Sequence, residues 1–287
     1  MNNILNLQKY IKKHLPALFC IIATTGVTAN VSAANYVSDA DVKIDVNKAD
    51  EMSITPTKYN SNLDRLIKLA KTDPIELLEW SMSLYTKNVK DYSAVLHKQE
   101  RIDGELRKPQ DIEFWFKEKP YSLYMQWVNN PGAIDRLLYI EGLNDGHMLV
   151  HPTGAFSWLK SVKRKPKCPQ ALETSLRTAD EFGFYRAMRS LHKTFSEAGK
   201  KQKYKIKYLG PAKVYGRQSV GMEVTIPRKN NESGLRMFIF FDTEHILPIK
   251  YECYNEKGKL KSKYAFSKLK INTGTTGDIL CRAKDKF

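Results

Sequence analysis

The sequence is poor in cysteine and in acidic residues, and it lacks the short motifs that identify common enzyme classes. Only 4 of its 287 residues are cysteine, and their wide spacing does not fit a zinc-binding motif. No Gly-x-Ser-x-Gly elbow, phosphate-binding loop or dinucleotide fingerprint occurs, which argues against the enzyme classes that these motifs identify. Beyond the first 33 residues no apolar run is long enough to form a transmembrane helix.

The N-terminal segment has the pattern of a cleavable secretory signal. Three lysines precede an apolar stretch at residues 15–27, and the small residues that a signal peptidase needs end at Ala33. A lipoprotein signal at Cys20 is a weaker alternative, because the bulky Phe19 stands where that signal requires a small residue. We therefore predict a signal peptide over residues 1–33 and a mature protein that is periplasmic or secreted.

Basic residues dominate the charge of the chain. There are 47 Lys and Arg against 31 Asp and Glu, a formal net charge of +16, and many lysines cluster at residues 160–167, 200–207 and 257–263. Such an excess favours anionic partners, including an anionic membrane surface, although lysines on exposed strand edges also prevent aggregation. Nucleic acid is not an expected partner, because the chain carries an export signal and no recognisable binding motif. We expect a monomer.

Periodicity divides the mature sequence into a short lead-in and one folded domain. Residues 34–60 are polar without sustained periodicity and are predicted to be flexible, and a single domain is predicted over residues 61–287. Helical spacing occurs at residues 63–70, at 73–86 and at 173–198. Alternation predicts strands at residues 92–101, 111–117, 121–128, 136–141, 147–151, 156–162, 203–209, 219–226, 235–242, 248–255 and 261–270. Short connections between them imply antiparallel neighbours, so we predict an α+β fold with one large, curved antiparallel sheet and helices on one face.

The stretch IEFWFKEKPYSLYMQW, residues 112–127, places large apolar side chains on both faces of two adjacent strands. The side facing the helices is predicted to hold Phe114, Phe116, Leu123, Met125, Trp127 and Leu138, with Ile140 beyond them. Trp115, Tyr124 and Tyr139 are then predicted to lie on the opposite face, which is usually solvated. Either these side chains form an ordinary core with cross-strand pairs, or the curved sheet encloses an apolar cavity. A sixteen-carbon chain buried there would gain on the order of 12 kcal/mol before costs, at about 0.8 kcal/mol per CH₂.

The sequence predicts no metal site, no cofactor and no catalytic residue. His147 and His151 are four residues apart, but the surrounding Gly and Pro indicate a strand, on which the two rings would lie roughly 13 Å apart. Carboxylates such as Glu100, Asp103 and Glu105 are numerous, and their spacing alone does not identify an acid and a base.

Four segments resemble, in the same order, the motifs of an uncharacterised family of secreted bacterial proteins classed only as a domain of unknown function. They are ERIDGEL at residues 100–106, KPYSLYMQW at 119–127, GLNDGHMLVHPTG at 142–154 and LPIKYECYNEKGKLKSKYAFSKLKIN at 247–272. The resemblance covers residues 74–287, and the region 165–199 departs from the family's pattern.

That family is similar to the outer-membrane lipoprotein carrier superfamily, in which an incomplete antiparallel barrel wraps around helices and encloses an apolar cavity. Asp242, the Leu-Pro pair at 247–248 and the Tyr-Asn-x-x-Gly-x-Leu run at 254–260 resemble the closing strands of such carriers. The resemblance implies a carrier-like fold, with helices on the concave face of an incomplete β-barrel, and a role in binding lipid or lipoprotein. It brings no established catalytic residues.

These observations predict a periplasmic or secreted binding protein that holds a lipid acyl chain or a lipidated peptide in an apolar cavity, as carrier or sensor, without catalysis. Its partner would be a lipid or a lipidated protein. Two alternatives remain: an envelope interaction module that uses the basic surface without a lipid ligand, and a hydrolase that acts on envelope lipid or glycan. The sequence also leaves open whether a disulfide joins two of Cys168, Cys253 and Cys281.

Overall fold

The structure, a computed structural model, describes residues 42–43, 58–200, 204–227, 234–274 and 276–287. The predicted signal peptide with its cleavage site, and most of the predicted lead-in, lie outside these residues. Every helix in the described ranges is too short or too polar to cross a membrane.

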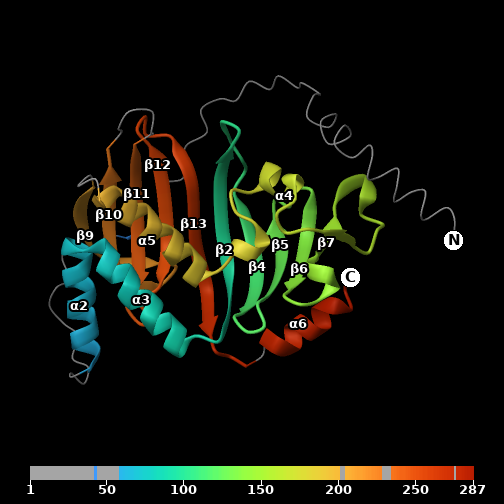
Figure 1. The fold of residues 1–287 in the computed structure, drawn as a ribbon, viewed down its shortest axis with the longest axis horizontal. Helices are drawn as coiled ribbons and strands as arrows, with labels where there is room; N and C mark the ends of the chain where they lie inside the picture. The colour runs from blue at the N-terminus through green and yellow to red at the C-terminus, as the bar shows by residue number, and fades with distance from the viewer. Residues whose placement is uncertain (1–41, 44–57, 201–203, 228–233, 275) are drawn as a thin grey trace. The chain divides into compact units, whose positions relative to one another are not determined.

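In the described part of the chain thirteen strands form one antiparallel sheet (Figure 1). Its order is β1-β9-β10-β11-β12-β13-β2-β4-β5-β6-β7-β8, with β3 paired to β2 alone, and the two ends do not join. The strands are β1 Val42–Lys43, β2 Asp91–Ile102, β3 Glu105–Leu106, β4 Gln110–Lys117, β5 Ser122–Asn129, β6 Ile134–Ile140, β7 Met148–Pro152, β8 Val162–Arg164, β9 Lys205–Val214, β10 Arg217–Ile226, β11 Leu235–Asp242, β12 Pro248–Asn255 and β13 Leu260–Ile271. The predicted α+β class with a large open antiparallel sheet is confirmed.

Two helices lie between β1 and β2, as periodicity predicts. They are α2, Lys58–Thr72, and α3, Pro74–Asn88. Asp73 separates them, because its Oδ1 accepts hydrogen bonds from the backbone N–H groups of Ile75 at 3.0 Å and Glu76 at 2.9 Å. Proline in the first turn of α3 costs no hydrogen bond, so the local sequence determines where this helix begins.

The single helix predicted over residues 173–198 is wrong, because this region contains three separate elements. They are α4 Pro169–Thr174, the 3₁₀ helix η4 Ala179–Glu181 and α5 Phe184–Lys200. Gly183 precedes α5 with a φ of +113°, which residues other than glycine rarely adopt. A Cβ at this position would lie 3.1 Å from the Phe116 ring. The strand predicted at 156–162 is also wrong in extent, since the 3₁₀ helix η3, Gly154–Phe156, occupies its start.

Helices α2, α3 and α5 cover one face of the sheet, which we call the inner face. Figure 1 shows α3 and α5 lying next to each other across the strands. The hydroxyl of Ser81 in α3 donates a hydrogen bond to the carbonyl of Ile246, so α3 is also attached to the turn between β11 and β12. One apolar cluster fills the space between helices and sheet. Its fully buried members include Leu66, Leu77, Leu78, Tyr92, Phe114, Phe116, Phe184, Phe195 and Phe241.

A second apolar cluster lies on the opposite, outer face, where the C-terminal helix α6, Thr276–Lys284, packs against β4, β5 and β6. Its buried members are Tyr124, Leu138, Ile140, Leu280 and Ala283. Trp115 and Tyr124 lie on this face as predicted, but the face is covered, and Tyr124 is only 1% exposed. The physical reason is α6, which supplies a cover that the strand pattern does not reveal.

The faces predicted for β6 are also wrong. Leu138 pairs with Tyr124 in the outer cluster, whereas Tyr139 lies on the inner face with its ring centroid 5.7 Å from that of Tyr121. A shift of one residue moves every side chain of a strand to the other face. Leu137 and Leu138 are both apolar, so the alternation in β6 does not determine which of them faces the helices.

Candidate functional site

A layer of aromatic rings covers the middle of the inner face between β2, β4, β13 and α5. The ring of Tyr92 lies at its centre, with centroid distances of 4.9 Å to Phe116 and 5.0 Å to Phe184. The Phe184 ring lies 4.7 Å from that of Phe266. Contacts of this kind contribute about 0.5–1.5 kcal/mol each beyond simple burial. The aromatic layer therefore joins three strands and a helix through one apolar surface.

Two tyrosine hydroxyls attach this layer to the start of α5 and to the chain just before it. The hydroxyl of Tyr92 accepts a hydrogen bond from the backbone N–H of Phe184 at 3.0 Å, and that of Tyr121 donates to the carbonyl of Ala179. Burial raises the pKa of both phenols above the usual range for tyrosine. Both hydroxyls are therefore neutral anchors in an apolar environment.

Most of the residues predicted to line a cavity come together on the inner face. Four of them are buried there as two ladder pairs, Phe114 with Met125 and Phe116 with Leu123. Trp127 pairs with Ile112 towards the end of β5 and is half-buried. Leu138 is not part of this group, because it faces α6 on the outer side of the sheet.

Residues 165–183, which we call the lid segment, cover part of the aromatic layer less completely than α5 does. The Phe182 ring of this segment lies 4.9 Å from that of Phe114, and Cys168 also packs against the inner cluster. However, the side chains of Leu172 and Leu176 are 50% and 44% exposed. The lid segment therefore presents apolar side chains to the solvent as well as to the core.

Charged side chains on the inner face hold the lid segment. Glu100 is 2% exposed and accepts a hydrogen bond from the backbone N–H of Leu176 at 3.3 Å. Lys98 forms an ion pair with Glu100 at 3.1 Å and donates a hydrogen bond to the Ser175 hydroxyl at 3.2 Å. Tyr264 also donates to Glu100, which satisfies its second oxygen. Two directional bonds thus connect the lid segment to β2, and Tyr264 of β13 fixes the Glu100 carboxylate that accepts one of them.

A groove of about 370 Å³ lies on the outer face beside α6. Its lining combines the buried Ile140 and Leu280 with Lys117, Glu141, Lys284 and the exposed thiol of Cys281. Among the described residues neither lysine has a carboxylate partner. A lining that is part apolar and carries charges of both signs suits a small, partly apolar molecule.

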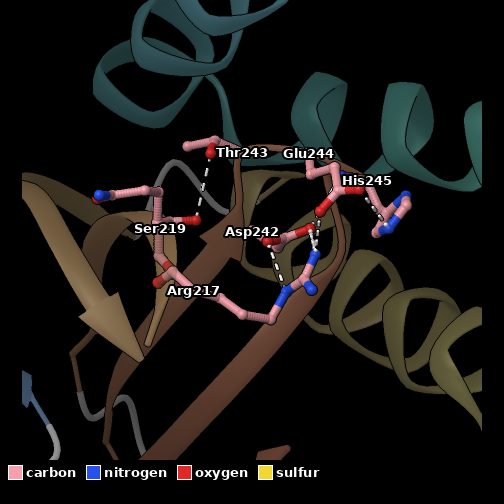
Figure 2. Close-up of polar contacts among 7 residues, drawn as sticks. Arg217, Ser219, Asp242, Thr243, Glu244 and His245 are labelled. Atoms are coloured by element: carbon pink, nitrogen blue, oxygen red, sulfur yellow. Dashed lines mark hydrogen bonds and ion pairs between the residues drawn. The ribbon is translucent and has the colours of Figure 1, made fainter. Parts of the chain in front are cut away.

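Figure 2 shows a polar corner where β11 turns into β12. Asp242 is 1% exposed and accepts hydrogen bonds from Arg217 at 2.9 and 3.0 Å and from the backbone N–H of His245 at 2.9 Å. Ligand atoms of Asp242, Glu244 and His245 converge within 4.8 Å of one another. Arg217 also donates to Glu244 at 2.7 Å, so its guanidinium already compensates both carboxylates and fixes the turn. We therefore assign this corner to the fold.

Three cysteines fall in the described ranges, and all three are free thiols. Cys168 lies in the lid segment, Cys253 is buried on β12 and Cys281 is exposed on α6. Burial raises the pKa of the Cys253 thiol, which disfavours its reactive thiolate form. No disulfide therefore closes the described part of the chain.

A family model described as "Protein of unknown function (DUF1571)" matches residues 89–282. No curated protein matches the sequence. The predicted relation to a family of unknown function is confirmed.

Several solved structures are similar to the chain. The Pseudomonas aeruginosa MucA/MucB complex matches at 17% identity and a TM-score of 0.40, over 78% of this chain and 60% of the other. The lipoprotein LppX of Mycobacterium tuberculosis matches at 12% identity and a TM-score of 0.41, and the match covers 69% of this chain and 96% of LppX. A putative outer membrane lipoprotein-sorting protein domain from Vibrio parahaemolyticus matches at 13% identity and a TM-score of 0.35, and the match covers 74% of this chain and 98% of that domain. The chain spans less than two thirds of the MucB chains, and no ligand or partner follows for it from matches with these scores.

Proposed function

We propose that this chain, which belongs to the DUF1571 family of proteins of unknown function, binds a lipid acyl chain or a lipidated peptide against the aromatic layer beneath the lid segment. The observation that carries the proposal is a buried aromatic layer whose cover is held in part by a few polar bonds. The binding residues would be Phe114, Phe116, Leu123, Met125 and Trp127. Leu138 is excluded from this set by its position on the outer face.

An acyl chain can offset the polar bonds that hold the lid segment to β2. Two hydrogen bonds attach the lid to Lys98 and Glu100, and hydrogen bonds to charged groups contribute about 1.5–3 kcal/mol each. An acyl chain gains about 0.8 kcal/mol for every CH₂ that it buries, so about eight buried methylenes offset the loss of both bonds. Binding therefore requires displacement of the lid segment and no chemical reaction.

Positive charge near the lid segment supports an anionic head group. Lys163 and Lys167, in the lysine cluster at residues 160–167, are 57% and 67% exposed, and they form long ion pairs with Asp145 at 3.6 Å and Asp180 at 3.5 Å that leave them open to solvent. A head group held outside the apolar layer would meet these ammonium groups, and the attraction would weaken with salt. Together with the predicted export signal, this favours a lipid of the bacterial envelope as the cargo and a periplasmic or secreted protein as the carrier or sensor.

Native mass spectrometry of the protein purified from an envelope fraction tests the proposal directly. We expect a stoichiometric adduct that is released on denaturation and is identified as a lipid or an acylated peptide. A mass without adduct that persists after incubation with envelope lipids would contradict lipid binding. It would instead favour an interaction module that acts through the basic surface.

Two variants separate ligand binding from ordinary packing. Trp127→Ala removes a half-buried ring on the inner face, whereas Leu138→Ala removes a buried side chain from the outer cluster of the same hairpin. We expect Trp127→Ala to weaken binding of a fluorescent sixteen-carbon fatty acid by roughly tenfold, because one apolar contact with the ligand is lost. The free energy of unfolding in urea should change little. Leu138→Ala should lower stability and leave the affinity unchanged. Equal loss of affinity and stability in both variants would show that the aromatic layer is only core.

A further inference from the structure

Three side chains on the outer face of β2, β4 and β13 form a continuous line of hydrogen bonds. His97 Nδ1 lies 2.7 Å from Asp111 Oδ1, and His97 Nε2 lies 2.8 Å from Ser267 Oγ. The histidine and aspartate side chains are 25% and 34% exposed, and Ser267 is half-buried. The line is therefore held by three strands and is partly exposed to solvent.

The chemistry of the three groups determines which atom carries each proton. An ionised Asp111 only accepts, so Nδ1 of the neutral imidazole carries the proton and Nε2 accepts the hydrogen bond from Ser267. Asn129 donates to the second oxygen of Asp111 at 3.1 Å, which fixes the carboxylate. The Tyr215 ring stacks on the imidazole at 4.4 Å between centroids with an interplanar angle of 18°. A nucleophile, a base and an orienting carboxylate are thus positioned as serine hydrolysis requires.

The backbone beside Ser267 departs from regular strand geometry. Ser267 pairs with Val95 and Lys270 with Ser93, so β13 has an extra residue here, a β-bulge. Lys268 has a φ of +52°, a left-handed conformation that costs energy for any residue with a side chain. A bulge leaves the extra residue out of the regular ladder, and ester hydrolysis at Ser267 would require one backbone N–H of this bulge to stabilise the oxyanion.

We propose that Asp111, His97 and Ser267 form a nucleophilic serine site that hydrolyses carboxylic esters. Ser267 Oγ attacks the carbonyl carbon while its proton moves to His97 Nε2, and the ester C–O bond breaks as the alcohol leaves with that proton. Water then attacks the acyl-serine, passes a proton to His97, and the carboxylic acid leaves as the serine regains its proton. Asp111 stabilises the imidazolium during both steps. This activity is separate from lipid binding beneath the lid segment, because the two sites lie on opposite faces of the sheet.

A second histidine–aspartate pair provides a matched control. His151 Nδ1 lies 2.7 Å from Asp135 Oδ1, the same separation as in the proposed site. No serine hydroxyl bonds to the other ring nitrogen of His151 within the described residues. If any surface histidine beside an aspartate hydrolysed the ester non-specifically, substitution of His97 and substitution of His151 would therefore slow hydrolysis equally.

The test uses the full chain, a fluorophosphonate probe and p-nitrophenyl acetate. We expect the probe to label Ser267, as located by peptide mass spectrometry, and the labelling to disappear in Ser267→Ala. His97→Gln should slow both labelling and ester hydrolysis by about 10²-fold or more, the usual contribution of a general base. His151→Gln should react like the wild type. Circular dichroism and urea unfolding establish that each variant is folded.

Three results would overturn the proposal. The first is a folded wild-type protein that neither takes the label at Ser267 nor hydrolyses the ester faster than Ser267→Ala. The second is equal slowing by His97→Gln and His151→Gln, which would indicate non-specific histidine catalysis. The third is labelling at another residue that persists in Ser267→Ala. In each case the three side chains would be a cross-strand contact that stabilises the sheet.

Discussion

The inner and outer faces of the same sheet differ in the interactions that their side chains make. On the inner face one apolar cluster joins the strands to α2, α3 and α5. On the outer face α6 covers an apolar patch of β4 to β6, whereas β10 to β12 carry the ion pairs Arg236–Glu223 and Lys250–Glu252. Apolar burial is non-directional, while ion pairs and hydrogen bonds fix particular atoms. The contrast indicates that apolar packing predominates on the inner face, with Lys98 and Glu100 as the charged exception, whereas directional pairs position the outer side chains of β10 to β12.

The largest effect is expected from a cavity in the inner face. Phe116 is fully buried, with its ring 4.9 Å from Tyr92 and 5.1 Å from Tyr121, so Phe116→Ala removes contacts on two sides. We expect it to lower the free energy of unfolding by about 3–5 kcal/mol, measured by urea denaturation. A loss below about 1 kcal/mol would show that the aromatic layer is loosely packed and already accommodates a ligand-sized gap.

A smaller effect is expected on the outer face beneath α6. Leu280 is 4% exposed in a cluster of few residues, so Leu280→Ala should cost about 2–3 kcal/mol, the lower end of the range for buried leucine. Leu143, 39% exposed at the rim of the same groove, is the control, and Leu143→Ala should change stability by less than about 0.5 kcal/mol. Equal effects of the two substitutions would mean that α6 contributes little to the folded state.

Local patterns in the sequence predict the elements whose structure depends on near neighbours. The start of α3 follows from Asp73 and the proline after it, since an N-cap acts within a few residues. The faces of β4 and β5 follow from alternation in residues 112–127, which places Phe114 and Phe116 inward as observed. Lys98 and Glu100 occupy inward positions of β2, and charges there are a signal that could have indicated the contact with the lid segment.

The remaining features depend on contacts that no local pattern contains. The faces of β6 are ambiguous because Leu137 and Leu138 are both apolar, and only pairing with β5 selects between them. The hydrogen bond between His97 and Ser267 joins residues 170 positions apart, so their spacing in the sequence carries no sign of the contact. Whether the predicted binding residues hold a lipid stays a prediction, since their burial fits both a core and a ligand surface.

A glycine on the outer face of β10 tests how tightly that face is packed. A Cβ at Gly221 would lie 2.7 Å from Phe240 Cε1 and 3.2 Å from Leu209 Cβ, so Gly221→Ala should cost about 1–3 kcal/mol through overpacking. Gly277 in α6 has no atom within 4 Å of such a Cβ, and Gly277→Ala should stabilise by about 0.5–1 kcal/mol. If both substitutions stabilised the protein, the outer face would have room around the Phe240 ring that the contacts do not indicate.

The smallest effect is expected from a single ion pair on the outer face, and it should depend on pH. Arg236 Nε donates to Glu223 Oε1 at 2.6 Å, and this hydrogen bond lowers the pKa of Glu223 in the folded protein. In the unfolded chain Glu223 takes up its proton at a higher pH than in the folded protein. The ion pair therefore stabilises the fold above the unfolded pKa of about 4.3, and this stabilisation is lost as the pH falls through the pKa of Glu223 in the folded protein.

Glu223→Gln measures this contribution. Arg236 is 55% exposed, so the variant should cost less than about 1 kcal/mol at pH 7, and the difference from wild type in urea unfolding should shrink as the pH is lowered from 5 to 2. A difference that stays constant over this range would assign the effect to contacts that do not depend on the carboxylate charge. Arg236 would then stabilise the outer face mainly by stacking on Phe238, 4.8 Å from its ring centroid, and the two faces would be more alike than their charges suggest.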